Sequence, residues 1–134
     1  MNLLARREHT VWELQRKLSK KSQDSTLITE VIHVLADEGL QSDARFAEAY
    51  LRMRAKRGFG PERIQLELEE RKVAPHLIER AFQNNDICWQ TEIRTVWQKR
   101  FGDEIPTDYM EKAKQKRFLQ YRGFSIGQIN ALLE

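Results

Sequence analysis

The sequence lacks the features that mark several common classes of protein. It contains one cysteine, Cys88, which excludes an internal disulfide framework and indicates a reducing compartment. No apolar run approaches the ~18 residues of a membrane span, and the opening segment MNLLARREHT has no signal-peptide apolar core. We therefore expect a cytoplasmic protein without a membrane partner.

The sequence also lacks any useful stretch that alternates polar and apolar residues as a strand does. Apolar residues recur instead at helical spacing, as in Leu27, Val31 and Leu35. This pattern predicts an all-α protein. The predicted helices span residues 4–21, 25–38, 42–57, 61–71, 75–84, 86–101, 107–122 and 126–133.

Residues that begin and end helices agree with this prediction. Thr10 with Glu13, and Ser125 with Gln128, fit the capping box at a helix start. Further expected positions are N-caps at Asp24 or Ser25, Ser42 and Asp86, first turns at Pro61 and Pro75, and helix ends at Gly39 and Gly123.

A weak repeat runs through the chain. Leu18 precedes Ile28 by ten residues, and the same spacing joins Leu68 to Ile78 and Leu119 to Ile129. Helices with basic and aromatic ends, AKRGFG and QKRFGD, follow the first two pairs. We predict three tandem three-helix repeats at 1–58, 59–104 and 105–134, the third truncated after two helices, in an elongated and curved array.

The segment RMRAKRGFGPERIQLELEERK poses a choice between a phosphate-binding loop and a turn. A dinucleotide fingerprint needs a preceding strand and a further glycine, and a Walker A loop needs Gly-Lys-Ser/Thr; the segment has none of these. Gly58 and Gly60 permit positive φ, and Pro61 can start a helix. A turn between two helices is favoured.

Catalytic patterns are also missing. His9, His33 and His76 are scattered without ligand-spaced partners, and Cys88 has no obvious histidine partner. The glutamates near residue 70 share a short amphipathic helix with cations, as on a solvated helix face. We expect no enzymatic activity, no cofactor and no metal site.

The net charge is only +3, but the charges are segregated. Segment 45–57 carries one acidic residue among its many cations, segment 112–122 carries cations and no acidic residue, and segment 23–39 has no Lys or Arg. Cations in last turns partly offset helix dipoles. Their recurrence at the helix ends of the predicted repeats indicates a basic surface for a partner.

Three segments stand out, EHTVWELQRKL at 8–18, LADEGLQSDARFAEAYLRMRAKRGFGPERIQLELEERKV at 35–73 and KAKQKRFLQYRGF at 112–124. Together they resemble the RecX family of RecA regulators. The resemblance covers most of the chain and contains no catalytic motif. It implies three tandem three-helix repeats. Relative to that family, the N-terminal lead and the loop at 19–25 are short, which puts any filament contact made by a longer lead in doubt.

The resemblance also implies a function, which is to bind the RecA filament on DNA, limit its recombinase, ATPase and coprotease activities, and promote its disassembly. We expect a monomer that lies in the filament groove and binds single- or double-stranded DNA weakly alone. The candidate partner-binding residues, chosen by charge, are Arg52, Arg54, Lys56, Arg57, Arg63, Arg71, Lys72, Lys114, Arg117 and Arg122. Charge reversal at Arg54 and Arg57 is expected to weaken inhibition without disturbing the fold.

Two other classes remain open at this point. Three-helix units can be helix-turn-helix modules that bind DNA without sequence specificity and without RecA. A scaffold that binds other helices would need neither partner.

Overall fold

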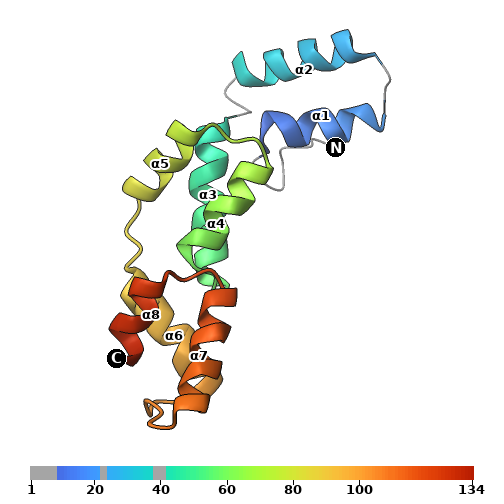
Figure 1. Cartoon of the computed structure of the whole chain (residues 1–134). Coiled ribbons are helices and arrows are strands. Elements are labelled where there is room, and N and C mark those ends of the chain that lie inside the picture. The colour runs from blue at the N-terminus through green and yellow to red at the C-terminus, as the bar shows by residue number, and fades with distance from the viewer. Residues whose placement is uncertain (1–8, 22–23, 38–41) are drawn as a thin grey trace. The chain divides into compact units, whose positions relative to one another are not determined.

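A computed structural model describes residues 9–21, 24–37 and 42–134 of the 134-residue chain. All regular elements in these residues are α-helices, which confirms the all-α prediction (Figure 1). The helices are α1 (Val11–Ser19), α2 (Ser25–Asp37), α3 (Asp43–Lys56), α4 (Pro61–Glu70), α5 (Pro75–Gln83), α6 (Trp89–Phe101), α7 (Tyr109–Tyr121) and α8 (Ile126–Leu133). Among the described residues, none of these helices has the length and apolar character that a membrane crossing requires.

Most helix starts follow the predicted caps. Both capping boxes form, with the Thr10 side chain accepting from Glu13 N and the Ser125 side chain from Gln128 N. Asp24 Oδ1 accepts from Leu27 N at 3.1 Å, and Ser42 Oγ from Arg45 N at 3.2 Å. A side-chain oxygen that accepts from the first turn satisfies amides that have no partner inside the helix.

Two predicted helix starts were wrong. The helix predicted over 4–21 begins at Val11 because Thr10 is its N-cap, and residues 4–8, like Gly39, lie outside the described residues. The helix predicted from Asp86 begins at Trp89, and Cys88 is its N-cap. The Asn85 side chain accepts from Ile87 N at 2.8 Å, which keeps this stretch in a turn.

The chain divides into two compact units, Met1–Tyr50 with Leu68–Asn84, and Leu51–Glu67 with Asn85–Glu134. In the first unit, α1 and α2 pack side by side around Leu14, Ile28 and Ile32 (Figure 1). Asp43 at the start of α3 accepts a 3.0 Å hydrogen bond from Val11 N. A separate stack in this unit joins the rings of Phe46 and Tyr50, whose centroids are 5.4 Å apart.

In the second unit, α6, α7 and α8 share one apolar core. Its fully buried members include Ile93, Trp97, Leu119 and Phe124. Trp97 Nε1 donates to the buried Gln115 Oε1 at 2.7 Å, so the indole N–H keeps a partner inside the core. This core fixes the positions of α6 and α7, which carry many of the basic residues of the unit.

The structure supports two of the three repeat pairs found in the sequence. Leu68 lies in the last turn of α4 and Ile78 in α5, just as Leu119 lies in the last turn of α7 and Ile129 in α8; all four are buried. Val73 N donates to Leu68 O at 3.2 Å, and Phe124 N donates to Leu119 O at the same distance. The residues before these donors, Lys72 and Gly123, have φ of 60° and 102°. The two helix ends therefore have the same left-handed termination.

Candidate functional site

The GFGP segment is a turn between α3 and α4, as predicted. Gly58 has the left-handed φ of 89°, which favours glycine. Gly60 is needed for a different reason. Its N–H donates to Arg122 O at 2.8 Å, and a Cβ at this position would lie 2.4 Å from the carbonyl carbon of Gly123. The turn is therefore held against the end of α7 by close contact between two backbones.

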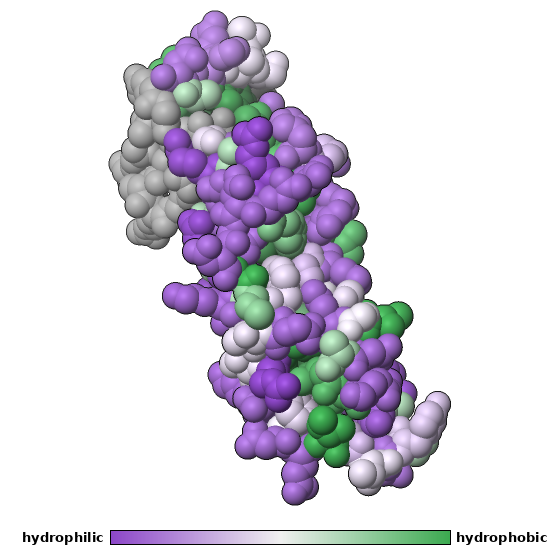
Figure 2. All heavy atoms as spheres, turned by 90° about the vertical axis from the view of Figure 1, so that its left-hand side faces the viewer, coloured by the Kyte–Doolittle hydropathy of each residue, from purple (hydrophilic) through white to green (hydrophobic). Residues whose placement is uncertain are grey.

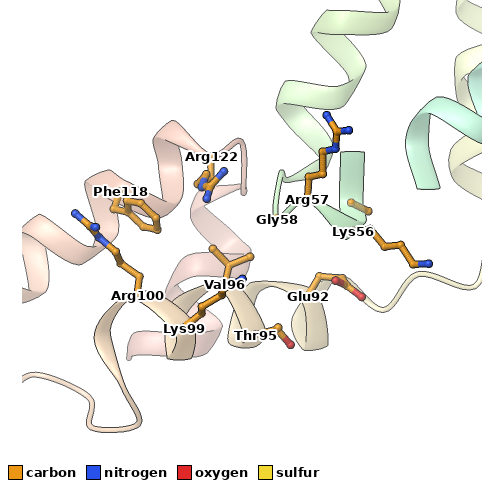
Figure 3. Close-up of a pocket in the computed structure, with 11 residues that line it drawn as sticks. Lys56, Arg57, Gly58, Glu92, Thr95, Val96, Lys99, Arg100, Phe118 and Arg122 are labelled. Atoms are coloured by element: carbon orange, nitrogen blue, oxygen red, sulfur yellow. The ribbon is translucent and has the colours of Figure 1, made fainter. Parts of the chain in front are cut away.

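This contact places the end of α3 beside α6 and α7 and leaves an open pocket of about 310 Å³ between them (Figure 3). We call it the basic pocket. Its lining includes the cations Lys56 and Arg57 from the end of α3, Lys99 and Arg100 from the end of α6, and Arg122 after α7. Glu92 is the one carboxylate in this lining.

The cations of the basic pocket are not neutralised by any carboxylate in the part of the chain that the structure describes. None of the five forms an ion pair with a residue that the structure describes, and all except the half-buried Arg122 are exposed. Clustered cations repel one another, and an anion in the pocket relieves that repulsion. Guanidinium groups suit carboxylate or phosphate oxygens, which they bind in pairs.

An aromatic ring lies between two of these cations. The guanidinium carbons of Arg100 and Arg122 are 5.3 and 5.5 Å from the centroid of the Phe118 ring, and Figure 3 shows Phe118 between them. Cation–π contacts at these distances orient a guanidinium while leaving its N–H groups able to donate. The pocket therefore combines two arginines positioned against a ring with the exposed side chains of Lys56, Arg57 and Lys99.

The structure divides the predicted partner-binding residues into several groups. Lys56, Arg57 and Arg122 line the basic pocket. Arg52, Lys114 and Arg117 belong to the same unit and are exposed outside the pocket lining. Arg71 and Lys72 belong to the first unit, where Arg71 Nε lies 3.5 Å from Glu13 Oε2 and its guanidinium lies over the Tyr50 ring.

Two predicted residues, Arg54 and Arg63, have partners inside the protein. Arg54 donates to both carboxylate oxygens of Glu67 at 2.8 Å, and Arg63 Nε donates to Glu67 Oε2 at 3.3 Å. The side chains of Arg54 and Glu67 are each 15% exposed. Charge reversal of Arg54 would therefore disturb the fold, contrary to the expectation from the sequence.

Two residues of the pocket, Lys99 and Arg100, are missing from the sequence prediction. They lie in the last turn of α6, immediately before Phe101, in a basic-aromatic pattern similar to that of Lys56 and Arg57, which precede Gly58 and Phe59. That pattern could have identified Lys99 and Arg100 as candidate partner-binding residues. What the sequence could not show is that both helix ends meet at one pocket.

Some cations of α7 are also paired. Lys112 and Lys116 both contact the Glu134 carboxylate, the first at 3.7 Å. The hydrogen bond from Lys116, together with the positive charge of Lys112, lowers the pKa of Glu134. Lys114 and Arg117 on the same helix form no ion pair with any described residue, so α7 keeps two open cations on its exposed face.

The described residues contain no group of three or more His, Cys, Asp or Glu side chains that could hold a metal ion. Cys88 is exposed, and a hydrogen bond from the Thr91 side chain lowers the pKa of its thiol. The lining of the basic pocket contains neither this thiol nor a histidine. The clustered cations of this lining have the chemistry that suits an anion.

The fold and the pocket define an all-α protein of tandem three-helix domains with a basic surface. Family models for the first, second and third three-helix domains of RecX match residues 1–35, 42–81 and 90–133. The chain belongs to the RecX family. These boundaries group α6 with α7 and α8, whereas the division predicted from the sequence groups α6 with α4 and α5.

Individual relatives agree with this assignment. The chain is 44% identical to Regulatory protein RecX of Ectopseudomonas mendocina over 99% of its own length and 89% of the relative's. It is 42% identical to Regulatory protein RecX of Halorhodospira halophila, covering 98% of this chain and 81% of that one. The fold also matches a crystal structure of RecX from Lactobacillus salivarius with a TM-score of 0.73, at 23% identity over 96% of this chain and 86% of that one.

Proposed function

We propose that this protein binds the RecA filament assembled on DNA and inhibits its recombinase, ATPase and coprotease activities. In this role it acts in the cytoplasm, in recombinational DNA repair and the SOS response. The observation that carries the proposal is the match of three successive RecX domain models along the chain. The name of the relatives, Regulatory protein RecX, fits a role in control rather than in catalysis.

The basic pocket is the contact site that we assign within this function. A RecA filament on DNA offers phosphates and acidic side chains, and both are ligands for closely spaced arginines and lysines. Lys56, Arg57, Lys99, Arg100 and Arg122 are available for them because none is paired inside the described protein.

The test uses charge reversal on two faces of one helix. Lys99 lines the basic pocket, whereas Arg94 is exposed on α6 but is not part of that lining. The Lys99→Glu and Arg94→Glu variants have the same net charge, so a general loss of positive charge affects both equally. ATP hydrolysis by RecA on single-stranded DNA is followed while each variant is titrated in.

We expect half-inhibition by Lys99→Glu to need about tenfold more protein than the wild type, equivalent to ~1.4 kcal/mol. Arg94→Glu should inhibit as the wild type does. Similar inhibition by both variants would show that the pocket is not the contact. A wild-type protein that leaves hydrolysis unchanged would contradict the proposed function itself.

A further inference from the structure

Arginines and aromatic rings alternate through the second unit in a column that ends at the surface. The guanidinium carbon of Arg54 lies 3.8 Å from the centroid of Phe59. That of Arg63 lies 4.6 Å from Phe59 and 5.4 Å from Tyr121. Arg63 therefore contacts both rings, and Tyr121 is the outer member of the column.

The inner part of this column is rigidly held. Glu67 accepts two hydrogen bonds from Arg54 and one from Arg63, as described above. Arg63 Nη1 also donates to the backbone carbonyl of Tyr121 at 3.4 Å. Arg63 is thus fixed to the helix end that carries Tyr121, which favours one orientation of the ring.

The outer end is open to solvent. The Tyr121 side chain is 75% exposed, although a tyrosine normally buries much of its ring. Within the described residues its one ring contact is with Arg63. An exposed aromatic ring supported from behind can accept another flat group.

Two unpaired cations share the exposed face of α7 with this ring. Lys114 and Arg117 precede Tyr121 by seven and four residues, a spacing that places the three side chains on one side of the helix. Both are exposed, and the last turns of α7 contain no acidic residue. The face therefore presents an aromatic ring next to a short row of positive charge.

We propose that this face binds single-stranded nucleic acid, with a base stacked on Tyr121 and backbone phosphates at Lys114 and Arg117. Proteins that bind single strands combine a basic track with aromatic side chains on which bases stack. In a duplex the base faces are already stacked on each other, so this arrangement selects a single strand. An acidic peptide would be bound by the cations alone and would not use the ring.

This inference rests on the proposed function only in taking DNA as a partner, and its test omits RecA. Binding of a fluorescently labelled oligothymidine is compared at low salt with that of an abasic strand of equal length and charge, using fluorescence anisotropy. The two strands differ in having or lacking bases. We expect the wild type to bind oligothymidine about fivefold to 150-fold more tightly.

Three tyrosine variants separate stacking from other effects. Tyr121→Ala should bind the two strands equally, whereas Tyr121→Phe should keep the preference because it keeps the ring. Tyr109→Ala is the matched control, since Tyr109 is an 81% exposed tyrosine at the acidic start of the same helix and should not affect binding. Lys114→Ala and Arg117→Ala should each reduce the log–log salt slope by about 0.7.

Two results would overturn the inference. One is equal affinity of the wild type for the two strands, and the other is a preference for oligothymidine that survives in Tyr121→Ala. The RecA assay is run in parallel on the same variants. A wild type that prefers oligothymidine but does not inhibit RecA would contradict the proposed function alone, and the reverse result would contradict this inference alone.

Discussion

At the scale of single residues, arginines with the same charge have different roles. Arg54 is bound on both sides, by Glu67 and by the Phe59 ring, whereas Arg57 three residues later is exposed at the basic pocket. The sequence predicts both as partner-binding residues because it shows their charge. It does not show that Glu67, thirteen residues from Arg54, has its carboxylate at the right place to pair with it.

This difference predicts opposite outcomes for two charge reversals. Arg54→Glu should lower the free energy of unfolding by about 3 kcal/mol, because it leaves two carboxylates together in a largely buried position. Arg57→Glu, which loses no ion pair to a described residue, should change it by less than about 0.5 kcal/mol. Urea unfolding followed by circular dichroism measures both variants. Equal midpoints would show that the Arg54–Glu67 pair does not stabilise the fold.

At the scale of helices and turns, the sequence predicts most of the fold. Helical periodicity identifies each helix, and local side-chain caps such as Thr10 and Ser125 fix their starts, because both signals depend on residues a few positions apart. The prediction fails at Asp86, where a suitable capping residue is present but the helix starts three residues later. The close contact between the backbones of Gly60 and Gly123 joins residues that lie far apart in the sequence, so no local sequence pattern predicts it.

The GFGP turn therefore gives a second pair of contrasting substitutions. Gly60→Ala should destabilise the protein by about 2–4 kcal/mol, because its Cβ would lie 2.4 Å from backbone atoms that a side-chain rotation cannot move. Gly127→Ala is the control. Its Cβ would approach no atom closer than 3.9 Å, and alanine in a helix is favoured over glycine by up to about 1 kcal/mol.

Thermal and urea unfolding of the two alanine variants, compared with the wild type, check this prediction. The stability of Gly127→Ala should equal or exceed that of the wild type, while the transition of Gly60→Ala should move to lower temperature. If Gly60→Ala were as stable as the wild type, the two backbones would not be in close contact in solution.

At the scale of the whole molecule, the sequence predicts a repeat but does not determine which helix opens each unit. Two of the ten-residue Leu–Ile pairs mark the connections from α4 to α5 and from α7 to α8. The structure confirms that α4 and α7 end in the same way. The pairs do not show which helix opens a repeat, because α3 and α6 end in the same basic-aromatic pattern. The family models begin the third repeat near α6. The division at 1–58, 59–104 and 105–134 and the elongated, curved shape stay predictions.

A second question at this scale is whether the protein binds DNA tightly by itself or needs RecA assembled on the DNA. A helix-turn-helix module would bind free duplex tightly, and its log affinity would fall against log salt with a slope of about −0.9 for each phosphate contact. A filament regulator takes part of its binding energy from RecA, and hydrophobic and hydrogen-bonded contacts to a protein depend much less on salt. The basic pocket, with its exposed cations, is compatible with either class.

We therefore predict that affinity for RecA on single-stranded DNA exceeds affinity for the same DNA alone, and that the gap widens as salt rises. The measurement is fluorescence anisotropy of the protein labelled at its single cysteine, Cys88, which is exposed and lies outside the lining of the basic pocket. It is made at two salt concentrations, with and without RecA and a non-hydrolysable ATP analogue. Raised salt should remove most of the binding to free DNA and leave most of the binding to the filament. Equal loss in both cases would favour the DNA-binding module, because phosphates would then supply nearly all of the affinity.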